Sequence, residues 1–156
     1  MGRFASMFGA WVDLERKVSD EAAKLRAKDK LRVYEWRPVK LPELPALWNW
    51  IDDGAEVNVV DTQRDDDIVI ITATLGVLPA DLEESMGRLV RLLDVFIDTV
   101  DPALRQRPVL PDKNGTSTAR AARRIITRSS FDNFNDTPVM CMDMMIRVQL
   151  PKVFDQ

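Results

Sequence analysis

The chain has 156 residues, of which 46% are hydrophobic and 30% charged, and its formal net charge is −3. This length and composition indicate one globular domain with a core of its own and exclude wholesale disorder. The chain contains no histidine and one cysteine, Cys141. These counts exclude an internal disulfide framework, the multi-cysteine zinc patterns and any mechanism with a histidine base.

The small net charge conceals two oppositely charged segments. Residues 52–67 contain seven acidic residues and one basic residue, whereas residues 105–128 contain seven basic residues and one acidic residue. A subunit with two different, complementary surfaces can contact copies of itself head to tail, which generates rings or filaments. The candidate subunit or partner contacts are Asp65, Asp66, Asp67, Arg105, Arg107, Lys113, Arg120, Arg123 and Arg124.

The first expected element is an amphipathic helix at about 4–27. Its apolar residues recur at three- and four-residue steps, which places them on one face. The central strands are expected within about 31–77, and they begin with a strand at 31–39. A proline-rich extended segment at 41–45 leads into a second strand at 46–51, whose side chains alternate between two faces.

The rest of the strand region is marked by acidic turns. Asp52-Asp53-Gly54 predicts a turn, residues 56–63 a strand, and residues 64–67 a charged tight turn. Residues 68–77 form a continuous apolar run, which is typical of a strand in the middle of a sheet that is covered on both faces.

A second helix is expected at about 80–100. Pro79 and the acids that follow it suit a helix start, and Asp101-Pro102 predicts its end. Residues 105–119 predict a long polar loop with an Asn-Gly turn, and loops of that length are usually functional or disordered.

The last part, at about 123–150, predicts a β-hairpin. Its arms are expected at 123–131 and 139–150, joined by a turn at 132–138. The second arm alternates strictly, which is typical of a half-buried strand. Its apolar face consists of Met140, Met142, Met144, Ile146, Val148 and Leu150. Together the elements predict an α+β fold, with one domain over residues 1–156 and a mostly antiparallel mixed sheet packed against two main helices.

No motif indicates a cofactor. The acidic pairs lack the spacing of a calcium loop, and no phosphate-binding glycine loop is present. Cys141 lies in an apolar run, which is typical of an inert core thiol. We therefore expect no metal, nucleotide or organic cofactor, and an enzyme is the least favoured class because its mechanism would depend on Asp, Glu or Lys alone. A nucleic-acid-binding protein that uses Arg105–Arg128 is an alternative, although no interleaved aromatics are available to stack bases.

The order of elements resembles a known family. An initial helix and a Tyr/Trp strand lead into Leu-Pro-Glu-Leu-Pro-Ala-Leu-Trp, and a charged turn precedes Ile-Val-Ile-Ile-Thr-Ala-Thr-Leu. A leucine-rich helix and a hairpin that ends Met-Ile-Arg-Val-Gln-Leu follow. Over about residues 4–150 this order resembles the tail terminator (tail completion) family of long-tailed bacteriophages.

The resemblance implies a function in the neck of the virion. Members of this family form a hexameric ring that caps the tail tube, stops its polymerisation and joins the tail to head-completion or connector proteins, without catalytic residues. We accordingly expect a homo-oligomeric ring, assembled in the host cytoplasm, which genomic DNA traverses without sequence-specific binding and which involves no membrane. Another head–tail connector or a tail-tube relative is an alternative.

Overall fold

The structure, a computed structural model, describes residues 2–53, 67–79, 82–106, 109–111, 114–115, 117–121 and 126–150. The elements are α1 (Arg3–Leu25), a 3-10 turn (Ala27–Asp29), β1 (Arg32–Val33), β2 (Ala46–Asp53), β3 (Asp67–Val77), α2 (Leu82–Gln106), β4 (Val109–Pro111), β5 (Ser117–Ala121), β6 (Ile126–Phe134) and β7 (Thr137–Leu150).

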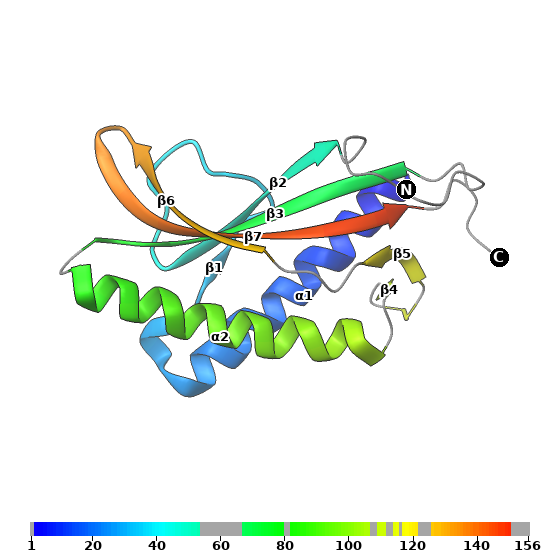
Figure 1. Cartoon of the computed structure of the whole chain (residues 1–156), viewed down its shortest axis with the longest axis horizontal. Coiled ribbons are helices and arrows are strands. Elements are labelled where there is room, and N and C mark those ends of the chain that lie inside the picture. Colours follow the sequence, from blue (N-terminus) through cyan, green and yellow to red (C-terminus); the bar gives the residue numbers. More distant parts are fainter. Residues whose placement is uncertain are drawn as a thin grey trace.

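Both helices pack against the same face of one curled, mixed sheet (Figure 1). The strand order is β1-β2-β3-β7-β5-β4, and β6 also pairs with β7. The pairing of β1 with β2 is parallel, and the other pairings are antiparallel. This arrangement confirms the α+β fold class that the sequence predicts.

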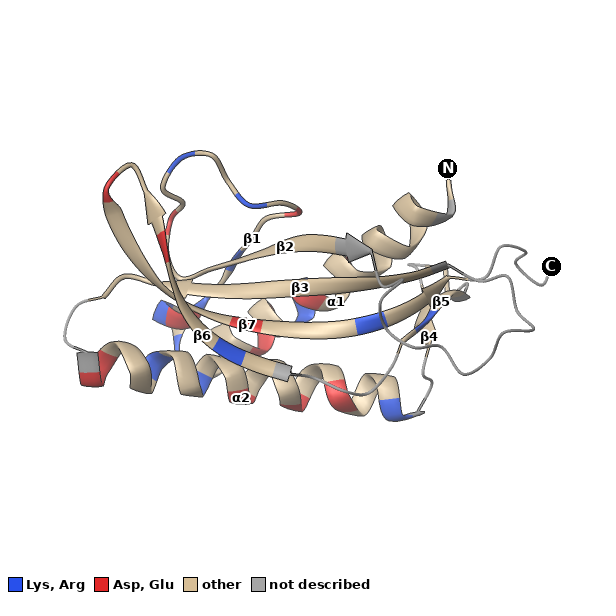
Figure 2. Ribbon diagram, turned by 45° about the horizontal axis from the view of Figure 1, so that its top comes forward, with Lys and Arg blue, Asp and Glu red and all other residues tan. Residues whose placement is uncertain are grey.

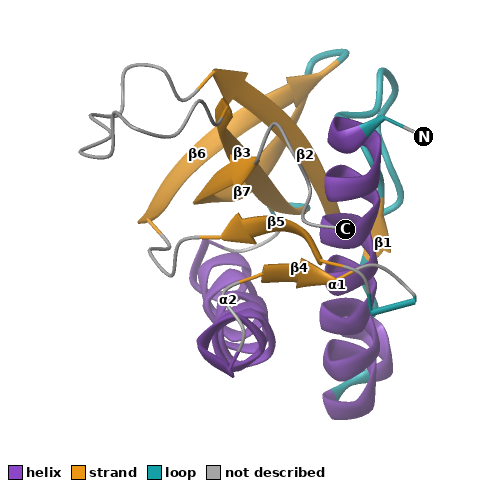
Figure 3. Ribbon diagram, turned by 90° about the vertical axis from the view of Figure 1, so that its right-hand side faces the viewer, coloured by secondary structure: helices purple, strands orange, loops and turns teal. Residues whose placement is uncertain are grey.

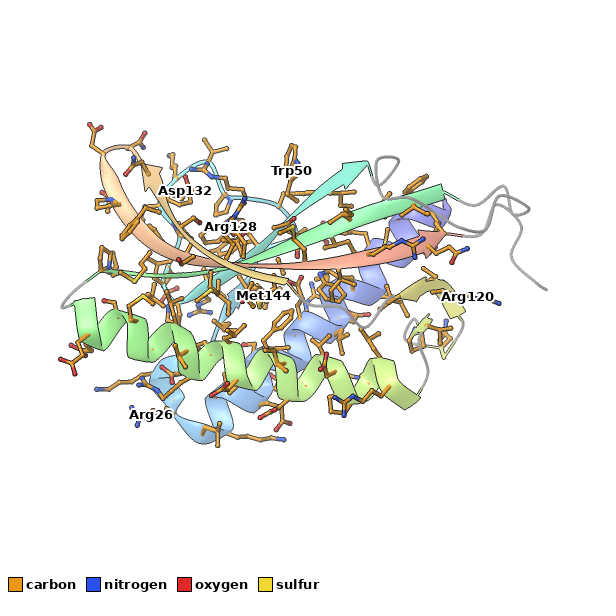
Figure 4. The ribbon with its side chains drawn as sticks, viewed as in Figure 1. Arg26, Trp50, Arg120, Arg128, Asp132 and Met144 are labelled. Carbon is orange, nitrogen blue, oxygen red and sulfur yellow. The ribbon has the colours of Figure 1, made fainter. Side chains whose placement is uncertain are left out.

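The main core lies between the sheet and the helices. β3 and β7 are paired along their whole shared length, and alternate residues of both strands point toward the helices. The apolar face predicted for β7 is part of this core, in which Met144 is fully buried (Figure 4). From α1, Trp11 reaches the core and contacts Phe96 of α2 edge-on, with ring centroids 6.2 Å apart.

A smaller cluster fills the opposite face of the sheet near the hairpin turn. Trp48 of β2 and Phe134 of β6 meet edge-on there, with ring centroids 5.7 Å apart. Gly76 of β3 lies against the Trp48 ring. A Cβ atom at this position would come within 2.7 Å of the ring, so the close packing requires glycine. Cys141 belongs to the same cluster, and burial raises the pKa of its thiol to about 12, as is typical of an inert core thiol.

The predicted strand at 31–39 is wrong for most of its length. Only Arg32 and Val33 pair with β2, and the chain then leaves the sheet. Trp36 instead stacks on Phe8 of α1, with ring centroids 4.5 Å apart and an interplanar angle of 11°. The predicted turn at Asp52-Asp53 is also wrong, because β2 continues through both residues. The predicted strand at 56–63 and most of the turn at 64–67 lie outside the described residues.

The second helix is longer than the sequence predicts. α2 continues through Asp101-Pro102 and ends at Gln106. Val100 and Leu104 are buried and extend the apolar stripe of the helix past the proline, whereas Pro102 itself is exposed. Burial of Leu104 therefore offsets the backbone hydrogen bond that a proline removes from a helix interior.

The long loop predicted at 105–119 contains structure. β4 and β5 pair antiparallel within it, and β5 joins the sheet beside β7. The buried Thr118 hydroxyl donates a hydrogen bond to the carbonyl of Leu110, which is also buried. Gly115 has a φ of +76°, in agreement with the predicted Asn-Gly turn.

The turn of the final hairpin is narrower than predicted. Strand pairing continues to Phe134 and resumes at Thr137, so that only Asn135 and Asp136 form the turn. Their φ angles are +47° and +66°. Two consecutive residues with positive φ match the tight hairpin turn that fits the twist of the strands, and Asn and Asp tolerate this conformation best after glycine.

Candidate subunit interface

The structure places three of the nine charged candidate residues. Asp67 begins β3 opposite Leu150 of β7, and Arg120 of β5 lies opposite Gln149, so both positions flank the same end of β7. Arg105 is exposed near the end of α2, 3.9 Å from the carboxylate of Asp101. The other candidates, Asp65, Asp66, Arg107, Lys113, Arg123 and Arg124, lie outside the described residues.

The sheet face opposite the helices is only partly covered. Near the hairpin turn Trp48 and its neighbours bury it, but beyond them Trp50 is 59% exposed and points away from the sheet (Figure 4). Ile70 and Thr72 of β3 are half-buried on the same face. The prediction that this strand is covered on both faces is therefore wrong here, because α1 and α2 both pack on the other side (Figure 3).

A polar network links β6 to the centre of this face. The Asp143 carboxylate accepts a hydrogen bond from the Thr74 hydroxyl at 2.8 Å. It also forms an ion pair with Arg128 at 3.1 Å. Asp143 is buried, whereas the Arg128 side chain is 67% exposed. Arg128 therefore satisfies a buried carboxylate and still presents its remaining donors to the surface.

Arg37, in the segment between β1 and β2, binds the hairpin that β6 and β7 form. Its guanidinium binds both carboxylate oxygens of Asp132, at 2.8 and 3.1 Å, and lies 4.1 Å from the centroid of the Phe134 ring. The hydrogen bond from Arg37 lowers the pKa of Asp132. Arg37 also donates to the backbone carbonyl of Asn133 at 3.1 Å. Residues 95 positions apart thus close one end of the curled sheet, which no local sequence pattern indicates.

Large apolar side chains are exposed at several places. The exposed fraction is 48% for Trp36, 59% for Trp50 on β2 and 66% for Phe131 on β6. Aromatic side chains are enriched in protein interfaces. The sequence predicts on which face of β2 Trp50 lies, but it does not show that this face is left open.

A groove separates the two helices on their outer side. Its larger part has a volume of about 890 Å³ and is lined by Leu25 and Val95 together with charged residues of both signs. Figure 2 shows charged residues along both helices and few on the strands. Acids and bases are balanced around the groove, and the described residues contain no group of three potential metal ligands.

One ionisable group is buried inside the main core. Glu15 of α1 is fully buried and accepts a hydrogen bond from the Asn49 side chain of β2, whose carbonyl accepts one from Trp11 at 3.1 Å. The second carboxylate oxygen of Glu15 has no partner. Burial raises the pKa of Glu15 to about 8, so the carboxyl group is mainly neutral at pH 7. The cluster joins α1 to β2 and is structural.

The comparisons with known proteins give no family. No protein-family model and no curated protein matches the sequence. Within the described residues, no helix has the length and apolar character needed to cross a membrane.

Proposed function

We propose that the chain is a structural subunit that assembles with copies of itself into a ring. One observation carries the proposal: Trp50 on β2 and Phe131 on β6 are both more than half exposed, on two different strands of one folded sheet. A subunit gains stability when a neighbour covers such side chains. Because two different surfaces are involved, copies that contact each other through them associate head to tail, and such an assembly is a ring when the rotation between neighbours closes.

We further propose that this ring is the tail terminator of a long-tailed bacteriophage. The support is the resemblance described above, which rests on the order of an initial helix, central strands, a long helix and a final hairpin. In this role the ring contacts the tail tube protein on one side and a head-completion or connector protein on the other. It belongs to the neck of the virion, and genomic DNA passes through it without sequence-specific contacts.

Charge reversal tests the proposed assembly. We expect simultaneous replacement of Arg120, Arg123 and Arg124 by Glu to weaken self-association roughly 10–100-fold, because several exposed charge pairs, each of about 0–1 kcal/mol, act together. Salt should weaken assembly of the wild type and restore assembly of the variant, since it screens attraction in the first and repulsion in the second. Mass photometry at low and high salt measures both effects, and circular dichroism checks the fold.

A matched variant controls for the change in net charge. Arg26, Lys28 and Lys30 are exposed, and Figure 4 shows Arg26 near α1, far from Arg120. Their replacement by Glu makes the same charge change and should leave assembly near the wild-type level. Weaker DNA retention with intact assembly of the first variant would favour the nucleic-acid-binding alternative. Normal assembly with unchanged DNA binding would show that the basic segment is a solvated surface.

A further inference from the structure

We infer that the groove between the two helices of one copy receives residues 38–42 of a neighbouring copy. The inference rests on the proposed assembly of copies and adds a contact surface to it, apart from Trp50 and Phe131. The groove and the segment hold the two most exposed large apolar side chains of the described residues, and they lie on opposite sides of the molecule.

The segment between β1 and β2 presents apolar side chains to the surface. Val39 is 88% exposed, the largest fraction among the large apolar side chains of the described residues, and Leu41 is 43% exposed. Lys40, between them, is exposed as well. A neighbour that covers Val39 and Leu41 removes apolar area from water, which favours association.

Residues 38–42 are held at both ends, so that their exposed middle is preorganised. On one side, the guanidinium of Arg37 binds the hairpin of β6 and β7. On the other side, Pro42 is buried, and Glu43 forms an ion pair with Arg32 at 3.0 Å. The prolines at both ends of the segment restrict its backbone further. A preorganised segment loses little conformational entropy when it binds.

The groove offers an apolar surface with charged residues around it. Leu25, at the end of α1, is 74% exposed, and Val95 of α2 is half-buried. Both residues line the larger part of the groove, of about 890 Å³, and a smaller part of about 210 Å³ that continues it. Pockets of this size hold small ligands, so the groove accommodates the side chains of a short peptide segment. An apolar centre with a polar rim is the usual anatomy of a protein interface.

The segment and the groove lie on opposite sides of the molecule. Tyr34 and Leu44, near the two ends of the connection between β1 and β2, pack against the Trp48–Phe134 cluster on the sheet face opposite the helices. The groove lies on the outer side of the helices, where Figure 4 shows Arg26, which lines its smaller part. In Figure 1 the same connection lies above the sheet and the end of α1 lies below it. A contact between two such surfaces is heterologous, and it places successive copies head to tail.

Charge at the rim agrees with this contact. Lys40 of the segment is basic, and Asp98 of α2 lines both parts of the groove. Within the part of the chain that the structure describes, neither residue forms an ion pair. When the apolar side chains dock, Lys40 therefore approaches a rim with an available carboxylate. Exposed pairs of this kind add little affinity but favour one orientation of the two partners.

The charge-reversed control variant remains a control for this contact. Arg26 and Lys30 line the groove, but their replacement by Glu, together with Lys28, leaves Leu25 in place and makes the rim more acidic. The residue that approaches from the neighbour, Lys40, is basic. The variant should therefore still assemble near the wild-type level.

Glutamate substitutions test the contact because they place a charge at its apolar centre. Val39→Glu and Leu25→Glu should each weaken self-association by roughly tenfold or more, since each removes a buried apolar side chain from the junction and adds a charge that requires water. Both side chains are largely exposed in the single copy, so the monomer should stay folded, which circular dichroism checks. The matched control is Leu78→Glu, between β3 and α2. It changes a leucine that is 52% exposed and does not line the groove, and it should assemble like the wild type.

Mass photometry of the variants, alone and mixed, shows whether the segment and the groove contact each other. We expect the wild type and Leu78→Glu to form the same assemblies, and the other two variants to dissociate at the same concentration. An equal mixture of Val39→Glu and Leu25→Glu should form heterodimers where neither variant associates alone, because the first keeps an intact groove and the second an intact segment.

Three results would overturn the inference. Wild-type assembly of both Val39→Glu and Leu25→Glu would place the contact elsewhere and leave the proposed function intact. Weaker association of only one of these variants would show that the segment and the groove do not bind each other. A wild type that stays monomeric at every concentration would refute the proposed assembly, and the inference with it.

Discussion

Raising the pH from about 5 to about 9 should lower the free energy of unfolding by on the order of 4 kcal/mol through Glu15. In the unfolded chain the carboxyl group has a pKa of 4.5, whereas burial raises it to about 8 in the folded protein. Between these values the folded state holds one proton more than the unfolded state. The contribution of Glu15 to the free energy of unfolding is therefore fully present below pH 4.5. It declines as the pH rises, by about 1.4 kcal/mol per unit, until it levels off above pH 8.

The surroundings of Glu15 explain why its charged form is disfavoured. Burial is the largest effect on the pKa of Glu15 and raises it, whereas the hydrogen bond from Asn49, the Trp11 indole and the charge of Arg16 oppose it more weakly. Urea denaturation at a series of pH values measures the effect. Glu15→Gln should remove most of the pH dependence, since a neutral amide replaces the titrating group.

The matched control for this prediction is Glu21→Gln, which changes an exposed residue of the same helix. Its pH profile should follow that of the wild type. If Glu15→Gln retains the wild-type slope, Glu15 is not the group that couples stability to pH.

Trp11→Ala should lower the free energy of unfolding by about 3–5 kcal/mol, the range found when a large buried aromatic side chain is removed. Trp11 is fully buried, packs edge-on against Phe96 and donates a hydrogen bond to Asn49. Its loss leaves a cavity between the helices and the sheet and takes a donor from the Glu15 cluster.

Trp50→Ala provides the comparison, because it removes the same side chain from a surface position that is 59% exposed. We expect a change within about 1 kcal/mol at this position. Chemical denaturation of both variants at pH 6, where Glu15 is neutral, separates the two effects. A loss below about 1 kcal/mol for Trp11→Ala would contradict the assignment of Trp11 to the centre of the core.

The sequence predicts those parts of the fold in which one local pattern decides the structure. The apolar alternation of β7 and the helical spacing of α1 each predict their element. The half-burial predicted for β7 holds only toward its end, because both faces are buried from Val139 to Met144, where the Trp48–Phe134 cluster covers the face opposite the helices. The end of α2 and the pairing of β4 with β5 depend instead on contacts between distant segments. Pro102 is a local stop signal, but α2 continues past it, and the buried Leu104 packs beyond the proline.

The candidate interface is less predictable for a related reason. The two charged segments are evident in the sequence, yet the position of Arg120 beside the end of β7 follows from strand register. Trp50 illustrates the limit: its face is set by alternation along β2, but its exposure depends on the packing of both helices on the other face.

The most direct test of the proposed function is native mass spectrometry of the purified protein, combined with negative-stain electron microscopy of the same sample. Closed assembly of a 17.8 kDa chain predicts one species whose mass is a fixed multiple of the subunit, six for the hexamer, and annular class averages. A single-copy mass at every concentration, or open filaments of variable length, would contradict a ring-forming subunit.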